Sequence, residues 1–410
     1  MSARASSALI VAGAIALTVS PARAETETGV ALRQNALTVG WPNRPAGSPL
    51  PEGAMGMSET RLRAWLGQSW GGATFTGALE VQSALSTVPG SGLGILGGGA
   101  PTASRPYEVW DLSLGAASAS AATTRARVER LDVAWSWGSV DLDVGRQPIS
   151  LGTSHFVGVL DVLAPFAPGA LDASYKPGID AARVRTALGS SGEAEVIVAG
   201  RDPWGEGGTL GRLRTPLAGM DLELVSGRFR NRGFGGLGWE GELGPAGVWG
   251  ELAWFQRRPE VEQYRAGGST AFSGVVGADF SLPFETRLGT AFMYQDFGAR
   301  RPEDLGAVST DAPFLEGWAF LRSASYGVLT LSRPLHPLVN ASLSGIVNLV
   351  DGSSLWQPRL TFSISDNSDL GAYGWIGAGA GPRVAGNTLT LGSEFGAVPT
   401  GVGLYARWFF

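Results

Sequence analysis

Few residues of this chain could support catalysis. It has no cysteine and only two histidines, His155 and His336. Ser154 precedes His155 directly, but a serine nucleophile needs a base and a third group that orients that base. A Gly-rich stretch is a poor frame for such a dyad, and His336 stands beside Pro337 in an expected short turn. The sequence contains no phosphate-binding loop and no clustered set of metal ligands. We therefore predict no catalytic residue, no metal and no cofactor, and a protein that is not an enzyme.

Charged residues instead recur singly, at every second position of short stretches. In one such stretch Arg61 and Arg63 flank Leu62. Strand side chains alternate between two faces, so this pattern predicts β-strands with one charged and one apolar face. The residues that we expect on the charged faces are Arg61, Arg63, Arg130, Asp141, Asp143, Arg183, Arg185, Glu195, Arg212, Arg214, Asp221, Glu223, Glu240, Glu251, Asp279, Arg287, Arg322 and Arg359.

The last ten residues form the most informative of these strands. Their apolar face consists of Val402, Leu404, Ala406, Trp408 and Phe410. An unpaired apolar edge invites aggregation, whereas pairing with the first strand would close a cylinder and remove the edge. This strand resembles the C-terminal signature of bacterial outer-membrane β-barrel proteins. The resemblance implies that Tyr405, Trp408 and Phe410 form the signal read by the barrel-assembly machinery.

The connections between the expected strands alternate in length. Short turns such as 138–139 and 366–369 alternate with longer segments such as 145–178 and 299–316. This alternation is typical of outer-membrane barrels, which have short periplasmic turns and long extracellular loops. We predict an all-β, antiparallel, up-and-down transmembrane barrel of about 18 strands, counting 35–41 as the first, with about 16 as the alternative. A soluble propeller or sandwich is the competing architecture, but its apolar faces must meet a partner sheet.

The N-terminus predicts export. Residues 1–24 combine Arg4, an apolar run at 8–19 and the sequence Ala22-Arg23-Ala24, which together are typical of a cleaved signal peptide. We assign 25–57 to an N-terminal segment that can include a first strand, and 58–410 to the barrel. The expected location is the outer membrane of a Gram-negative bacterium, with lipid, lipopolysaccharide and a hydrophilic solute as partners. A homo-oligomer stays open, and the excess of 36 acidic over 31 basic residues argues against nucleic acid.

The charged faces should point inward. An arginine at the bilayer midplane of a barrel costs about 2–4 kcal/mol, so the apolar faces are expected to meet lipid. Basic residues lie toward both ends of the sequence and acidic residues dominate its middle. A closed barrel would then have a basic wall opposite an acidic one, suited to polar solutes. The alternative is that these charges pair between neighbouring strands and stiffen the wall.

The segment 145–178 is too apolar for a solvated external loop. Connections of this length are usually functional or disordered, and we expect this one to fold into the mouth of the barrel as a constriction rather than lie on the surface. Its candidate residues are Arg146, Gln147, His155, Asp161, Phe166, Tyr175, Lys176 and Asp180. By strict alternation Arg146 would face lipid, so it should lie at headgroup level or follow a bulge.

A second resemblance covers residues 131–185. The hairpin that begins Leu131-Asp-Val-Ala-Trp135, the triplet Gly145-Arg146-Gln147, the pairs Leu160-Asp161 and Pro165-Phe166, and Gly178-Ile-Asp180 with Arg183 resemble alginate-export-type barrels. The resemblance implies an outer-membrane barrel with a polar, arginine-bearing pore. We expect a passive channel for hydrophilic solutes, anions included. The alternatives are a dedicated exporter of acidic polysaccharide, and a filled barrel whose external loops bind a partner.

Overall fold

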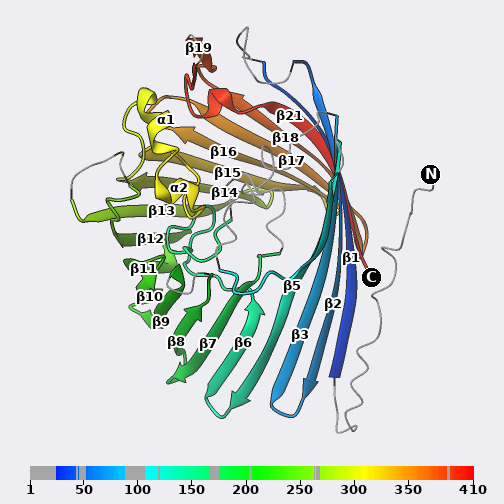
Figure 1. Cartoon of the computed structure of the whole chain (residues 1–410), viewed down its shortest axis with the longest axis vertical. Helices are drawn as coiled ribbons and strands as arrows, with labels where there is room; N and C mark the ends of the chain where they lie inside the picture. The colour runs from blue at the N-terminus through cyan, green and yellow to red at the C-terminus, as the bar shows by residue number, and fades with distance from the viewer. Residues whose placement is uncertain are drawn as a thin grey trace, which may run out of the picture.

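The chain forms one closed antiparallel β-barrel of eighteen strands (Figure 1). The computed structural model describes residues 25–42, 45, 52–87, 107–118, 121–166, 168, 175–202, 206–262, 264, 268–385 and 388–410. The barrel closes because the first strand, β1 (Glu25–Gly40), pairs with β2 (Met55–Trp70) on one side and with the last strand, β21 (Thr400–Phe409), on the other. The predicted fold class and strand number are therefore confirmed.

The remaining strands follow one another around the wall. They are β3 (Ala73–Ser86), β5 (Ala122–Trp137), β6 (Val140–Gln147), β7 (Ile179–Leu188), β8 (Gly192–Ala199), β9 (Gly208–Leu217), β10 (Met220–Phe229), β11 (Arg232–Leu243), β12 (Ala246–Gln256), β13 (Thr270–Leu282), β14 (Thr286–Gln295), β15 (Ser325–His336), β16 (Val339–Asn348), β17 (Ser354–Ser365) and β18 (Ser368–Ala378).

The smaller elements lie in the connections. They are the strands β4 (Ser113–Ser118), β19 (Arg383–Ala385) and β20 (Thr388–Thr390), the helices α1 (Leu305–Val308) and α2 (Ala312–Leu315), and the 3₁₀ turns η3 (Pro302–Asp304) and η4 (Phe395–Ala397). In the described part of the chain, no helix has the length and apolarity needed to cross a membrane.

The two rims of the barrel differ. Every second connection is a short turn, and these turns share one rim with the start of β1 and the end of β21. One of them is the β9–β10 turn, where Ala218 and Gly219 have φ of 55° and 80°, as tight hairpins require. We call this the short-turn rim. The opposite rim carries α1, α2 and the longer connections, and we call it the long-loop rim (Figure 1).

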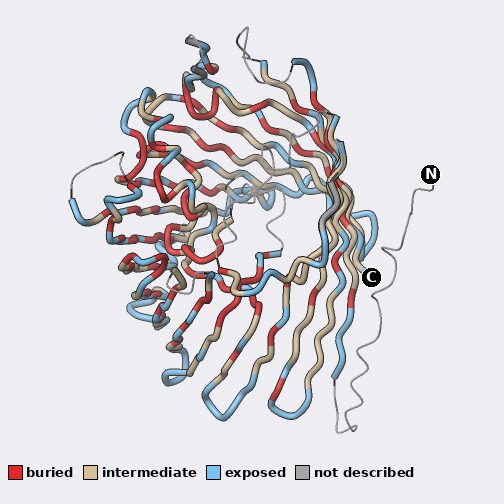
Figure 2. Tube along the Cα trace, in the orientation of Figure 1, coloured by how far each residue is buried: buried red, intermediate tan, exposed pale blue. Residues whose placement is uncertain are grey.

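Neighbouring residues of one strand differ sharply in exposure. On β10, Leu224 is 48% exposed and Glu223 only 1%, and on β12 the corresponding values are 51% for Leu252 and 0% for Glu251. Figure 2 shows this alternation along the strands. In a closed cylinder one face of each strand points outward and the other inward. The apolar face is therefore the outer one, and the charged face points into the barrel.

The N-terminal boundary predicted from the sequence is wrong. The barrel begins at Glu25, not near residue 35 or 58, because β1 pairs with β2 from Glu25 to Val39. The Pro- and Gly-rich composition belongs to the connection between β1 and β2. The predicted signal peptide, 1–24, lies outside the described residues.

The outer face is not uniformly apolar, which also differs from expectation. On β1 and β2, Gln34 donates to Ser58 over 2.8 Å and accepts from Thr60 over 2.5 Å. One strand further, Ser83 and Thr124 form a hydrogen bond of 3.0 Å. The registers place Gln34, Thr60, Ser83 and Thr124 in one row across four strands. Their mutual hydrogen bonds reduce the cost of polar groups on an outward face.

The outward position of Leu224 generates a prediction. Leu224→Arg should lower the free energy of unfolding from a lipid bilayer by about 2–4 kcal/mol, because it places a cation near the middle of the apolar belt. Leu217→Arg, at the end of β9 beside the short turn, is the matched control, with an expected loss of about 0–1 kcal/mol. Urea titration in liposomes measures both values. Equal losses in the two variants would contradict an outer face that meets hydrocarbon.

Candidate functional site

The described part of the connection between β6 and β7, residues 148–178, folds into the barrel. We call this connection the inner loop. Its side chains Ile149, Leu160 and Leu163 are at most 1% exposed and belong to the same apolar cluster as inward residues of β8 and β9, such as Ile197 and Leu210. Apolar loop residues therefore pack against apolar patches of the inner wall. This packing explains why the segment is too apolar for an external loop.

Glu251 anchors the inner loop. Its Oε1 accepts hydrogen bonds from the backbone amides of Thr153 and Ser154, over 2.7 and 2.6 Å. Its Oε2 accepts from the amides of Val159 and Leu160, over 2.6 and 3.0 Å. A buried carboxylate is costly unless donors replace water. Here four loop amides supply that replacement, so the loop and the carboxylate stabilise each other.

Neighbouring wall residues extend this anchor. Glu223 accepts from the amide of Gly152 over 2.7 Å, and Arg212 donates to the carbonyl oxygen of Ser150 over 3.0 Å. His155 lies between Asp279, 2.9 Å from its Nδ1, and Glu240, 3.1 Å from its Nε2. The inner loop is thus held along β9 to β13.

The other charged residues on the inner face of β6 to β10 pair with one another. Arg183 lies 2.9 Å from Asp143 and 3.4 Å from Glu195, and Glu195 lies 2.6 Å from Arg212. Arg214 donates to Glu223 over 2.7 Å. The predicted acidic wall facing an open lumen is therefore wrong. Most of its carboxylates are occupied by arginines of adjacent strands or by the inner loop, and the pairing alternative is right for this side.

Arg146 and Asp180 clamp the two ends of the inner loop. Arg146 is 1% exposed and donates to both carboxylate oxygens of Asp180, over 2.7 and 3.0 Å. Asp180 also accepts from the amides of Val109 and Trp110, in the segment leading to β4. The strand bounds place Arg146 and Gln147 on β6 and Asp180 on β7, so these three residues lie on the wall rather than in the loop.

The expected alternation fails at Arg146 because of Gly145. Gly145 has a φ of 129°, and a Cβ there would come within 2.2 Å of the Leu131 carbonyl oxygen. This backbone conformation favours glycine and departs from regular strand geometry directly before Arg146, so strict alternation of sides does not hold there. Arg146 therefore reaches Asp180 instead of lipid headgroups.

A second bond ties the loop to itself. Lys176, the only lysine of the chain, forms an ion pair with Asp161, and its carbonyl oxygen accepts a hydrogen bond from Arg130. Burial raises the pKa of Asp161 above its ordinary value, although Lys176 opposes this effect. Phe166 lies near Lys176, with 6.0 Å between Nζ and the ring centre.

The opposite side of the barrel interior carries a row of cations. Arg61, Arg33 and Arg407 stand in register on β2, β1 and β21. Glu59 lies 2.8 Å from Arg61, and Asp369 lies 2.8 Å from Arg407. The side chains of Arg61 and Arg407 keep 30% and 27% of their surface exposed, so solvent reaches this part of the interior. Like charges placed directly opposite one another are unfavourable, and an anion beside the row would relieve that repulsion.

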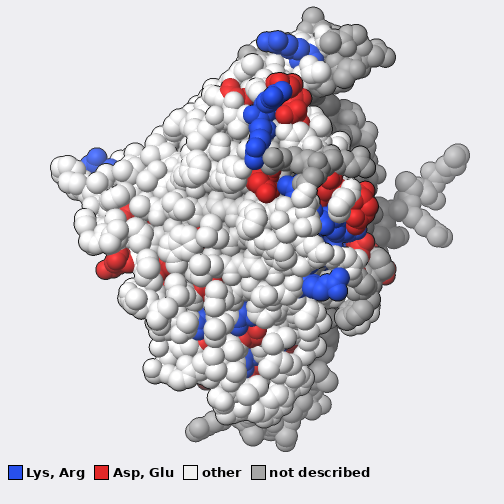
Figure 3. Space-filling view, turned by 90° about the vertical axis from the view of Figure 1, so that its left-hand side faces the viewer, with Lys and Arg blue, Asp and Glu red and all other residues white. Residues whose placement is uncertain are grey.

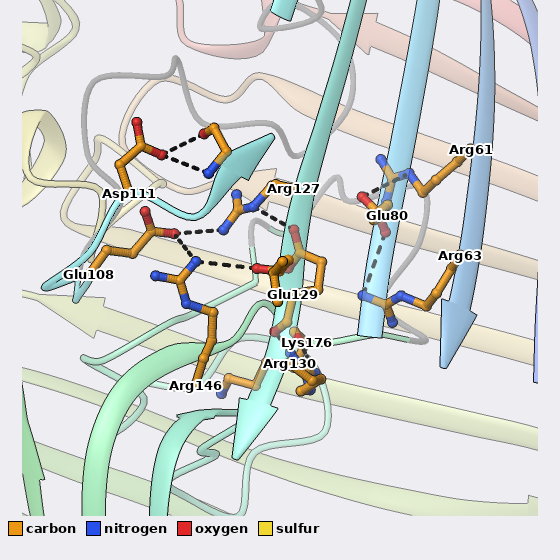
Figure 4. Close-up of polar contacts among 12 residues, drawn as sticks. Arg61, Arg63, Glu80, Glu108, Asp111, Arg127, Glu129, Arg130, Arg146 and Lys176 are labelled. Carbon is orange, nitrogen blue, oxygen red and sulfur yellow. Dashed lines mark hydrogen bonds and ion pairs between the residues drawn. The ribbon is translucent and has the colours of Figure 1, made fainter. Parts of the chain in front are cut away.

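The cation row lies next to the far end of the inner loop. Arg63, two residues from Arg61, lies 3.5 Å from Glu80 and has its guanidinium carbon 4.1 Å from the ring centre of Tyr175. Figure 4 shows Arg61 and Arg63 on either side of Glu80, together with the ion pairs that Arg127 of β5 forms with Glu108 and Glu129. The interior is thus lined by loop contacts on one side and by arginines on the other.

Of the remaining residues predicted to line the pore, all but Arg322 lie on strands of the wall. Asp141 accepts from Ser136 over 2.6 Å, and Arg185, Asp221, Arg287 and Arg359 lie on strands of the wall. Arg322 was expected on a strand beginning near Trp318, but β15 begins at Ser325. Ala319 and Leu321 are buried in the interior cluster, so the apolar residues of this stretch do not form an outer face.

Several inward residues were missed from the sequence. Arg407 was already visible on the polar face of the last strand, and the extent of β1 would have added Arg33. Tyr405 is 5% exposed, and its hydroxyl forms a hydrogen bond of 2.8 Å with that of Thr361, so Tyr405 lies on the inner face. Trp408 and Phe410 are 37% and 74% exposed and lie on the outer face.

The geometry around the histidines does not form a catalytic dyad. Ser154 donates its hydroxyl to the carbonyl oxygen of Val157, while His155 contacts Asp279 and Glu240. His336 accepts from the amide of Leu338 at the short-turn rim. Among the described residues, no group of three His, Cys, Asp or Glu side chains is arranged to hold a metal ion.

Comparison with known proteins identifies the fold. No protein-family model and no curated protein sequence matches the chain. The structure is similar to Acinetobacter baumannii OccAB4, with a TM-score of 0.55 and 10% identity, covering 94% of this chain and 98% of that chain. Pseudomonas aeruginosa OccK5 (OpdH) gives a TM-score of 0.55 at 8% identity, with 94% and 98% covered.

The fold is that of a porin barrel. A further structure, Pseudomonas aeruginosa OccK7 (OpdD), is similar with a TM-score of 0.52 at 8% identity, over 94% of this chain and 99% of that chain. Identities this low show a shared fold only. The resemblance to alginate-export-type barrels is not shown by these comparisons.

The role of Glu251 generates a prediction. Glu251→Gln leaves one carbonyl oxygen to serve four amides, and each unsatisfied amide costs about 1–3 kcal/mol. Hydrogen exchange at Thr153, Ser154, Val159 and Leu160 should therefore accelerate at least about tenfold. Glu240→Gln is the control, because Glu240 is half exposed and contacts the loop through His155. Unchanged exchange in Glu251→Gln would show that the loop is held by its apolar packing alone.

Proposed function

We propose that this protein is an outer-membrane channel for passive diffusion of hydrophilic solutes, anions included. The supporting observation is the row of cations inside the barrel, which consists of Arg61, Arg33 and Arg407. The side chains of Arg61 and Arg407 are partly exposed to solvent. Charged groups lining a wetted constriction set ion preference in channels. Arg61 lies 2.8 Å from Glu59 and 3.7 Å from Glu80, and Arg407 lies 2.8 Å from Asp369. The proposed anion preference rests on three guanidinium groups that stand side by side, two of which reach solvent.

The proposed orientation follows from the rims. Outer-membrane barrels have short turns in the periplasm and long loops outside the cell. The start of β1 and the end of β21 lie at the short-turn rim, so we assign both to the periplasmic side. The predicted signal peptide at 1–24 would deliver the chain for export. Trp408 and Phe410, on the outer face of the last strand, fit an assembly signal read by the barrel-assembly machinery. The oligomeric state is left open.

Other activities have less support. The hydroxyl of Ser154 is bonded away from His155, which argues against a serine hydrolase and for a protein that is not an enzyme. An exporter of acidic polysaccharide is not favoured by the structural neighbours. The third alternative, a filled barrel that binds a partner through its external loops, predicts no ion conduction.

The inner loop should narrow the channel. Deleting residues 150–175 removes Glu251's loop partners but keeps the Arg146–Asp180 clamp, so the wall should remain closed. The single-channel conductance in planar bilayers should then rise. Heat-modifiable migration of the folded barrel on gels is the control for folding. An unchanged current through a folded variant would refute the constriction role, and the absence of steps in the parent protein would refute the channel.

The cation row should set ion preference. The double variant Arg33→Ala and Arg61→Ala should shift the zero-current potential in a salt gradient toward the cation side, because it removes two of three in-register cations. Arg333→Ala is the control, since Arg333 stacks on Phe284 outside the barrel, with 5.1 Å from guanidinium carbon to ring centre. A potential that moves equally in both variants would argue against selectivity at this row.

A further inference from the structure

The outer face over β11 to β14 contains a groove with a volume of about 470 Å³. Two outward positions within it are glycines, Gly235 on β11 and Gly274 on β13. Glycine has no side chain, so the outer surface is lower at these two positions than at the bulky residues on the neighbouring strands. The groove runs beneath the level of the surrounding side chains, so it can accept a slender apolar group.

The walls of the groove are apolar. Leu252 and Trp254 of β12, Phe272 of β13 and Phe292 of β14 border it, and each is at least 36% exposed. Figure 3 shows a broad face of the molecule on which most of the surface is uncharged. The row of hydrogen-bonded polar residues on β1 to β5 has no counterpart among these wall residues. This part of the outer face is thus suited to a hydrocarbon chain.

A cation lies at the long-loop end of the groove. Tyr294, near the end of β14, lines the groove, and Arg300 donates to its hydroxyl oxygen over 3.1 Å. The backbone amide of Arg300 donates to Tyr264, whose hydroxyl donates to Asp304 over 2.8 Å, so this turn is held in place. Within the part of the chain that the structure describes, no carboxylate lies within 4.0 Å of the exposed Arg300 guanidinium.

We propose that this groove binds a phosphorylated acyl lipid of the outer leaflet. One acyl chain lies over Gly235 and Gly274, and the phosphate lies against Arg300 and the Tyr294 hydroxyl. Arginine presents a fork of donors that matches phosphate, and its position at the long-loop rim is the level of the outer-leaflet headgroups. The inference rests on the proposed membrane orientation but not on ion conduction.

Charge complementarity favours a lipid over a second copy of the chain. A second copy would have to bring an anionic group to Arg300 while filling an apolar groove of about 470 Å³. A phosphorylated lipid supplies both parts in one molecule. A larger residue can replace Gly235 without a steric clash, because a Cβ there meets only Trp254, at 3.9 Å.

The test counts lipids on the full-length folded protein by native mass spectrometry, after adding a bisphosphorylated, multiply acylated lipid to the detergent solution. Arg300→Ala should weaken binding about tenfold, because a charge-assisted hydrogen bond is lost. Gly235→Leu should weaken it similarly by filling the groove. The controls are Arg333→Ala and Gly211→Leu, an exposed glycine on β9 away from the groove.

Each outcome decides the matter. Weaker binding in both test variants but in neither control supports the site. Equal binding in Arg300→Ala and the parent would overturn the phosphate contact, and equal binding in Gly235→Leu would overturn the groove. A parent protein that runs as an oligomer, and that Gly235→Leu converts to a monomer, would instead assign the face to a second copy. Conductance measured in parallel separates failure of this site from failure of the channel.

Discussion

The structure depends on one electrostatic requirement: a carboxylate that faces the interior of the barrel must receive hydrogen bonds from protein or from water. Glu251 is fully buried, and four backbone amides of the inner loop surround it. Without those donors its desolvation would be strongly unfavourable. Without Glu251 the amides at two turns of the loop would lack acceptors. Each partner therefore fixes the position of the other.

This requirement makes the interior asymmetric. The carboxylates of β8 to β13 are occupied by arginines of adjacent strands and by the inner loop, and a cavity of about 230 Å³ remains between the loop and β12 to β14. We propose that solutes pass along β21, β1 and β2, where Arg61, Arg33 and Arg407 stand in register. In the proposed channel, the loop narrows the lumen and directs a solute toward the arginine side. The proposed charge preference depends on this placement rather than on the net charge of the chain, which is −5.

The sequence predicts the barrel well because strand alternation and turn length are local signals. It indicates the closed fold, the strand number and the inward loop from patterns such as Arg61-Leu62-Arg63 and the apolar segment after Gln147. It does not reveal which wall the loop covers, because the contact of Glu251 with Thr153 joins residues far apart in the chain. The alternation rule also fails where the backbone changes course. The backbone departs from regular strand geometry at Gly145, directly before the buried Arg146, and the Pro-rich stretch after β1 hides the start of the barrel at Glu25.

The absence of cysteine in the chain allows a direct test of the asymmetric interior. Single variants Ala31→Cys, inward on β1 beside Arg63, and Ser273→Cys, 4% exposed on the inner face of β13, can be treated with an anionic thiol reagent while the current is recorded. We expect fast modification and a fall in current for Ala31→Cys, and slow modification with little change for Ser273→Cys. Fast reaction at Ser273→Cys with none at Ala31→Cys would contradict a passage along the arginine side.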